Sequence, residues 1–316
     1  FRGGGEHFYR VTMDTGPHID FVLPPSGLPG AKSKHTLYGR NLPGSTPAKD
    51  ISIDGKPLEQ LTVEIEFPKA DASAPKPSLL SNPAQAVVDG FDYRLRTPTG
   101  VSNPILLSFA TGPVIAEQAA NDPPEAAQKV ALPCEYTGQF YPARDVDWIT
   151  FDAKKGEVCW VEVFSQRLGL PTDPFVLIQR VVTNDKGQPQ GLDVLEMYGT
   201  DANVGGAEFK TTTHDPVARF EVKEDGAYRV RVQDLFNQSE SDPRRVYRLS
   251  LRRENPDFHL VAIPQAPPPV DKAKKEVLVW TTLVRRGESI PVQVMVFRRD
   301  GFGGEIQLAA EGLPSG

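Results

Sequence analysis

The sequence has few of the residues that build disulfide frameworks or metal-thiolate sites. Only two cysteines, Cys134 and Cys159, occur in 316 residues, and such a pair says little about the redox compartment of the protein. The pair could form a disulfide, or it could be two small buried thiols on neighbouring strands. We favour the thiols, because an unbonded cysteine commonly serves as a small apolar side chain.

Motifs of the common enzyme classes are also missing. None of the five histidines pairs as His-x-x-x-His or lies near a cysteine at metal-ligand spacing, and no Gly-x-Ser-x-Gly elbow or phosphate-binding glycine loop occurs. Asp14-Thr-Gly16 resembles half of an aspartic-protease site, but that chemistry needs two carboxylates and the triplet occurs once. We read it as a turn, and we expect no enzyme.

Long apolar runs and excess positive charge are likewise absent. No stretch of about 18 apolar residues exists, so the sequence predicts no membrane span. The formal net charge is -6 without a basic block, which gives nucleic-acid binding no electrostatic support. The chain begins at Phe1 without a basic start and apolar run, so we expect any signal peptide to lie outside this segment.

Turn residues and alternating strands are abundant. Pro (30) and Gly (27) are spread along the chain, and segments such as 61–67, 158–164 and 228–232 alternate apolar and polar residues as half-buried strands do. Pairs such as Asp225-Gly226 separate them. Long amphipathic helices are absent, and the best short helix we expect lies over 124–129, capped by Asn121 and Asp122. The sequence therefore predicts an all-β fold of tandem sandwiches.

A repeat suggests the domain borders. Phe8-Tyr-Arg-Val-Thr-Met13 leads into 19–23, and Val246-Tyr-Arg-Leu-Ser-Leu251 leads into 258–262, each as a last strand running into the first strand of the next domain. We expect a strand at 304–309 and a segment cut at both ends. The predicted domains are 1–17, the tail of a truncated domain; 18–112; 113–256; and 257–316, the truncated start of another.

Residues 18–112 resemble an IPT/TIG immunoglobulin-like domain. The likeness lies in Ile19-Asp-Phe-Val-Leu-Pro-Pro-Ser-Gly-Leu-Pro-Gly30, in His35-Thr-Leu-Tyr-Gly-Arg-Asn-Leu42 and in Thr97-Pro-Thr-Gly-Val-Ser-Asn-Pro104. The glycine of Leu-Tyr-Gly-Arg-Asn-Leu is expected at a bulge or tight bend. Residues 257–316 look like the first strands of a further immunoglobulin-like module.

Residues 113–256 resemble a bacterial pre-peptidase C-terminal domain, which implies a β jelly-roll. The matching residues are Glu117-x-x-x-Asn121-Asp122, Gly138, Asp145-Val-Asp-Trp-Ile-Thr-Phe151, Glu224-Asp-Gly-Ala-Tyr-Arg-Val230 and Tyr247-Arg-Leu249. Such domains follow IPT-like domains in large planctomycete surface or secreted proteins.

The pre-peptidase resemblance implies a calcium site. Secreted collagenases hold calcium in the corresponding stretch, and the matching positions here are Glu117, Asn121, Asp122, Asp145 and Asp147. Ca²⁺ takes six to eight oxygen ligands, which carboxylates on two loops can supply. This chain has one acid fewer, since Gln118-Ala-Ala120 replaces part of the pattern. The alternative is that Asn121 and Asp122 cap the helix, and that Asp145 and Asp147 lie in a solvated turn.

Two further groups have structural interpretations. We expect five aromatic side chains to point into the core, and four arginines to form a solvated face or a docking edge between domains. The aromatics are Trp148, Phe151, Trp160, Phe164 and Tyr228, and the arginines are Arg244, Arg245, Arg252 and Arg253.

These observations favour a non-catalytic structural or adhesive array of β-domains, stiffened by calcium, in a protein that is extracellular, on the cell surface or in the periplasm. The expected partners are neighbouring β-domains, other surface proteins or polysaccharide. Two alternatives stay open: an accessory region of a secreted peptidase or other hydrolase, and a polysaccharide- or protein-binding module, which would need exposed aromatic side chains.

Overall fold

The chain folds into two β-sandwiches and a β-hairpin. The structure is a computed structural model, and it describes residues 11, 13, 15–70, 82–118, 121–207, 209–237, 239, 241–266, 284 and 287–312. The described helices are three short 3-10 turns: η1 (Pro83–Val87), η2 (Pro124–Ala126) and η3 (Gln166–Leu168). None of them has the length and apolar character to cross a membrane. The all-β prediction is confirmed.

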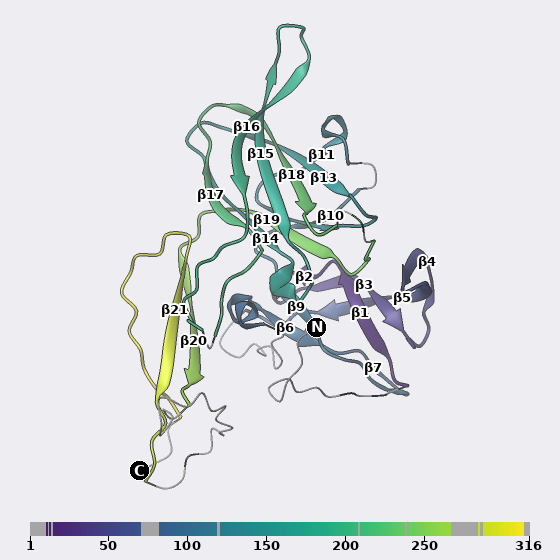
Figure 1. The fold of residues 1–316 in the computed structure, drawn as a ribbon, viewed down its shortest axis with the longest axis vertical. Coiled ribbons are helices and arrows are strands. Elements are labelled where there is room, and N and C mark those ends of the chain that lie inside the picture. The colour runs from purple at the N-terminus through teal and green to yellow at the C-terminus, as the bar shows by residue number, and fades with distance from the viewer. Residues whose placement is uncertain are drawn as a thin grey trace.

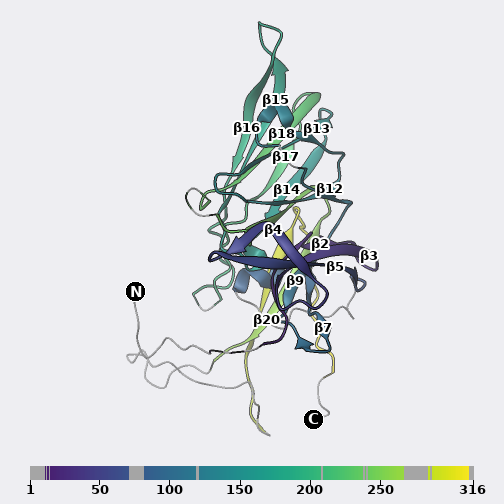
Figure 2. The same cartoon turned by 90° about the vertical axis from the view of Figure 1, so that its right-hand side faces the viewer.

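The first sandwich pairs a four-stranded sheet with a three-stranded one (Figure 2). The four-stranded order is β1 (His18–Leu23), β3 (Lys32–Arg40), β5 (Lys56–Glu66) and β4 (Thr46–Ile53). The other is β2 (Ser26–Gly27), β9 (Ile105–Phe109) and β6 (Gly90–Tyr93), and β7 (Arg96–Thr97) pairs with β8 (Gly100–Val101). The core contains Leu37, Phe67 and Leu107.

The predicted bend at a glycine is present in this sandwich. Gly39 lies opposite Ile19, beside a β-bulge between Ile19 and Phe21. A Cβ at Gly39 would lie 2.0 Å from the carbonyl oxygen of His18, so only glycine lets the two strands approach this closely.

The second sandwich packs two five-stranded sheets around the largest core (Figure 1). One sheet has the order β10 (Val114–Ala116), β12 (Cys134–Gln139), β19 (Val246–Arg253), β14 (Val158–Phe164) and β17 (Val217–Glu221). The other has the order β11 (Gln128–Lys129), β13 (Val146–Ala153), β18 (Gly226–Asp234), β15 (Pro174–Thr183) and β16 (Pro189–Met197). The tip of the β15–β16 hairpin projects beyond the sandwich in both views (Figures 1 and 2).

The third unit is the antiparallel hairpin of β20 (Asp257–Pro264) and β21 (Val292–Arg299). The prediction of a strand over 304–309 is wrong, because that segment has no regular secondary structure. Residues 1–10 and 267–283 lie outside the described residues, and so does Asp14. The predicted tail before residue 11 and the middle of the predicted domain over 257–316 therefore stay predictions.

Burial corrects part of the aromatic and arginine interpretation. Four of the five named aromatics are buried, but Trp160 is only half-buried and lines a cavity of about 320 Å³ between the units. Arg245 and Arg252 are buried, so the solvated-face reading is wrong for them. Their guanidinium groups pair with carboxylates, which offset the cost of taking a charge out of water.

Candidate cation site

Three carboxylates of the second sandwich meet at one end of its core. Glu117 follows β10 and donates its backbone N–H to the Thr137 carbonyl oxygen at 2.8 Å. Asp145 directly precedes β13, and Asp147 is its second residue. One carboxylate oxygen from each of the three lies within 4.8 Å of the others. The structure thus brings together the carboxylates of three of the five residues predicted to bind calcium, and a fourth, Asn121, contacts one of them.

Asp147 is the most enclosed of the three. Its side chain is fully buried, and it accepts hydrogen bonds from Asn121 Nδ2 at 2.8 Å and from the Tyr247 hydroxyl at 2.6 Å. Glu117 Oε2 accepts the backbone N–H of Gln139 at 3.0 Å. These neutral donors orient the carboxylates but do not balance their charge.

Burial dominates the electrostatics of the cluster. It raises the pKa of Glu117 well above the ordinary value, and the nearby charges of Asp147 and Asp145 raise it further. Burial, followed by the charges of Asp147 and Asp122, raises the pKa of Asp145 to about 8. Burial also raises the pKa of Asp147. Without a cation, the cluster holds protons near neutral pH because adjacent buried carboxylates resist ionising together.

Two buried oxygens of this region have no hydrogen-bond partner, Asp145 Oδ2 and Asn121 Oδ1. An unpartnered buried oxygen costs free energy unless a donor or an ion satisfies it. All the candidate ligands are carboxylate or amide oxygens, the type that Ca²⁺ prefers. The residues present therefore fit a hard divalent cation.

Asn121 and Asp122 do not behave as the alternative interpretation requires. The helix expected over 124–129 is present as the shorter 3-10 turn η2 over Pro124–Ala126, and Gln128–Lys129 is strand β11. The capping position of η2 is Pro123, which makes no side-chain hydrogen bond, so the predicted capping by Asn121 and Asp122 is wrong. The Asn121 side chain points instead to Asp147. Asp122 is exposed and acts on Asp145 only through its charge. The solvated-turn reading of Asp145 and Asp147 is also wrong, since both are buried.

Sequence reasoning missed the two tyrosines behind the cluster. Tyr247 holds Asp147, and the Tyr136 hydroxyl accepts from Asn121 Nδ2 at 3.0 Å and donates to Gln128 Oε1 at 3.1 Å. Both tyrosines occupy core positions in alternating strands, which gave no separate signal. Their hydroxyls have polar partners because a buried hydroxyl usually finds one.

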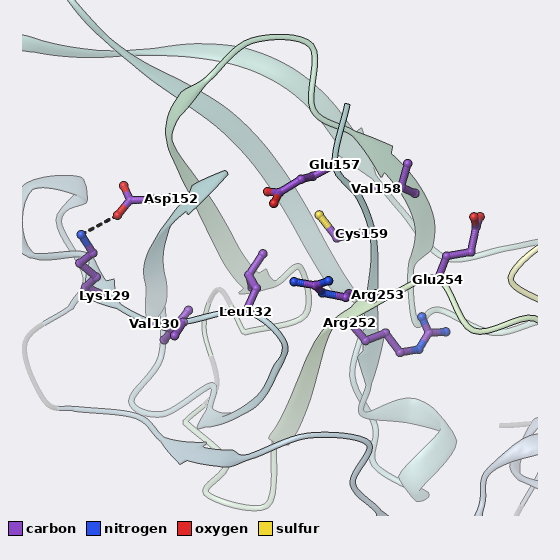
Figure 3. Close-up of a pocket in the computed structure, with 11 residues that line it drawn as sticks. Lys129, Val130, Leu132, Asp152, Glu157, Val158, Cys159, Arg252, Arg253 and Glu254 are labelled. Atoms are coloured by element: carbon purple, nitrogen blue, oxygen red, sulfur yellow. Dashed lines mark ion pairs between the residues drawn. The ribbon is translucent and has the colours of Figure 1, made fainter. Parts of the chain in front are cut away.

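A cleft of about 550 Å³ lies elsewhere in the second sandwich. Figure 3 shows Glu157 and Arg253 extending on either side of Cys159, with the Lys129–Asp152 ion pair across the cleft. Burial raises the pKa of the Cys159 thiol to about 11, and the charge of Glu157 adds to it. This thiol stays protonated at neutral pH and is a poor nucleophile.

The two cysteines are free and buried, as the favoured interpretation predicted. They do not lie on neighbouring strands, because β19 lies between β12 and β14.

No protein-family model matches the chain, and no curated protein matches it in sequence. Among solved structures, it is similar to the pre-peptidase C-terminal domain of collagenase from Bacillus anthracis, with 18% identity over 42% of this chain and 100% of that one and a TM-score of 0.29. It is also similar to CorA, a surface-associated copper-binding protein of Methylomicrobium album BG8, with 9% identity, 40% and 98% coverage and a TM-score of 0.25. A third is Aeromonas hydrophila PliG, a periplasmic inhibitor of g-type lysozyme, with 14% identity, 44% and 96% coverage and a TM-score of 0.22.

Proposed function

We propose that this chain is a non-catalytic spacer of a secreted, cell-surface or periplasmic protein, in which consecutive β-units are fixed to one another and stiffened by calcium. The observation that carries the proposal is that both faces of β19 are buried. Tyr247, Leu249 and Leu251 face the core of their own sandwich. The alternate residues, which would face water in an isolated sandwich, are also buried because the other units cover them.

The first and second sandwiches meet through an apolar contact. Val246, at the start of β19, packs in one cluster with Phe21, Ala48, Ile53 and Leu58 of the first sandwich. Burying such side chains at a junction favours a single arrangement of the two units.

A buried ion pair lies beside this apolar contact. Arg248 Nε donates to Glu135 Oε2 at 2.8 Å, and Arg248 Nη1 reaches across to Ser108 Oγ of the first sandwich at 2.9 Å. Glu135 in turn accepts the hydroxyl and backbone N–H of Thr111, at 2.5 and 2.9 Å. Burial alone would raise the pKa of Glu135, but Arg248 and Thr111 hold it below its ordinary value. The charged pair fixes the orientation in which the units join.

The hairpin is attached by charged contacts of the same kind. Arg252 Nη2 lies 2.8 Å from Glu162 Oε2 of its own sheet and 2.9 Å from Asp300 Oδ1, just after β21. Arg299 of β21 lies 3.2 Å from Asp89 of the first sandwich. Of the four arginines expected on a solvated face or a docking edge, Arg252 thus supports the docking edge, since it contacts the hairpin.

Calcium would occupy the cluster of Glu117, Asp145 and Asp147, and Asn121 would orient Asp147 there through its side-chain hydrogen bond. When bound, the ion supplies the positive charge that the neutral donors lack. Extracellular modules bind calcium weakly, with dissociation constants of about 10⁻⁴ to 10⁻³ M, so their sites fill where calcium is abundant. Glu117 belongs to the segment that leaves the first sandwich, so the ion would stiffen the chain just after the junction.

Small-angle X-ray scattering tests the spacer. We expect a profile that the fixed arrangement of the described units fits without added motion, and the same profile at high and low salt. Asp300→Asn is the comparison variant, because it weakens the contact of the hairpin and leaves the two sandwiches joined. A wild-type profile that only an ensemble of independently moving sandwiches could fit would contradict the proposal.

A further inference from the structure

Two exposed aromatic side chains lie at one hollow of the second sandwich. Among the described aromatic residues, Tyr198 and Phe236 are the well-exposed ones, at 57% and 52%. Tyr198 lines a hollow of about 480 Å³, together with Leu235 and His214. Phe236 lies at its edge, with its ring centre 5.8 Å from that of His214. Exposed rings gathered at one place indicate a binding surface, since scattered single ones need no explanation.

The rest of the lining is polar. It includes Asp173, Asp201, Lys210 and Thr212, and His214 Nδ1 lies 3.0 Å from Asp173 Oδ1. Rings that offer an apolar face, flanked by groups that donate and accept hydrogen bonds, suit a ligand with an apolar face and a hydroxylated rim.

The hollow is held in shape by short contacts. The segment after β16 meets the segment before β17 through paired backbone hydrogen bonds between Thr200 and Thr213, at 2.7 and 3.1 Å. Gly199 permits this approach, because a Cβ there would lie 2.4 Å from Cα of His214. The rings are therefore presented by a defined backbone, which lowers the entropy lost on binding.

Asp234 fixes the turn that carries Phe236. This buried carboxylate accepts the backbone N–H of Phe236 at 3.0 Å and that of Asp173 at 2.8 Å, and it pairs with Arg245 at 3.0 Å. One residue thereby sets both the aromatic edge of the hollow and the acid that contacts His214.

Charge narrows the class of ligand. The lining carries the carboxylates of Asp173 and Asp201 against the ammonium group of Lys210, and the whole chain has a formal charge of -6. Polyanions such as nucleic acids and polyuronates are repelled by this balance. A pyranose ring has a carbon-hydrogen face for the aromatic rings and hydroxyls for the polar groups. We propose that this hollow is a binding subsite for a neutral polysaccharide chain.

Affinity electrophoresis in native gels tests the site. The probes are hydroxyethylcellulose, glucomannan, soluble glycol chitin with neutral N-acetyl groups, and laminarin, with polygalacturonate as the charged comparison. We expect at least one neutral polymer to retard the protein and polygalacturonate to leave its mobility unchanged. Tyr198→Ala and Phe236→Ala should each raise the dissociation constant by about tenfold, because each removes one ring-stacking contact. Tyr198→Trp should keep the affinity, because it retains the ring.

The matched control is Leu192→Ala. Leu192 is exposed to 46% and lies on strand β16, which ends one residue before Tyr198. It does not line the hollow. Leu192→Ala should bind the polysaccharides as the wild type does. All of these surface variants should have the melting temperature of the wild type. The proposal would be overturned if no neutral polymer retards the protein, or if the double variant Tyr198→Ala/Phe236→Ala is retarded as strongly as the wild type. It would also be overturned if gelatin, and no polysaccharide, retards the wild type and this effect is lost in the double variant. Repeating the gels with a chelator separates this site from the calcium proposal.

Discussion

The Tyr247 hydroxyl donates a hydrogen bond of 2.6 Å to Asp147, and both side chains are fully buried. The tyrosine comes from β19 and the aspartate from β13, so the bond joins the two sheets across the core. It gives Asp147 a partner but no countercharge, and two further acids lie beside it. The packing of the two sheets therefore places three acidic side chains together without a countercharge from these donors.

Calcium should raise the melting temperature of the protein. A ligand that binds the folded state at about 100 times its dissociation constant adds about 2.7 kcal/mol to the free energy of unfolding. Asp145→Asn should abolish the shift, measured by thermal melts with calcium and with chelator. In chelator, this variant should be as stable as the wild type or more so, since it removes a buried acid whose ionisation the cluster opposes. Asp152→Asn, in the exposed ion pair with Lys129, is the control and should keep the shift. An equal shift in Asp145→Asn would contradict the site.

Without calcium, the cluster should make the protein less stable as the pH rises. The folded-state pKa values of Glu117 and Asp145 are raised, the second to about 8, while unfolded carboxyls titrate near 4. Between those values, the folded state binds more protons than the unfolded state, so the free energy of unfolding falls with pH.

Urea midpoints at pH 5 and pH 8 in chelator measure this effect. Other groups titrate too, so the wild type is compared with Glu117→Gln/Asp145→Asn, in which the fall should be smaller. If the urea midpoint falls by the same amount between pH 5 and pH 8 in both proteins, the ionisation of the two acids is not coupled to folding. Calcium should reverse the trend for the wild type, because binding requires deprotonated ligands.

Breaking the buried pair of Arg248 and Glu135 should destabilise the junction strongly. Arg248→Met leaves Glu135 as a buried unpaired charge, and such a loss costs about 3–5 kcal/mol in the free energy of unfolding. Urea denaturation provides the measurement. Adding Glu135→Gln should recover part of the loss, and the exposed Arg253→Ala should change stability by less than about 0.5 kcal/mol. A small effect of Arg248→Met would mean that the junction does not need the pair.

Both thiols should be inert in the folded protein. Burial, followed by a neighbouring glutamate, raises the pKa of Cys134 to about 12 and that of Cys159 to about 11. A disulfide reagent that absorbs on reaction should label them at neutral pH only as fast as the protein opens. The urea-unfolded protein, which should react at once with two equivalents, is the control. Rapid labelling of the folded protein would contradict the buried placement.

The sequence by itself determined the strands and their turns. Period-two alternation located 158–164 as β14 and 228–232 within β18, because a half-buried strand must alternate its side chains. The same argument predicted a strand over 304–309, but this segment is irregular in the structure. Alternation reports only which residues could share a face, and not whether a partner strand is present.

Tertiary structure decided everything that depends on which face is covered. Arg252 alternates with core residues in its strand and was expected on a solvated face or a docking edge, yet it is buried, and Arg248, two periods of the alternation earlier, is buried as well. Asp145 and Asp147 were placed in the candidate site by resemblance, but their raised pKa values follow from their burial between the packed sheets and, at Asp145, from the nearby charges of Asp147 and Asp122. Tyr198 and Phe236 are separated by 37 intervening residues and gave no joint signal. Burial and proximity depend on contacts between distant segments, and a local pattern does not encode these.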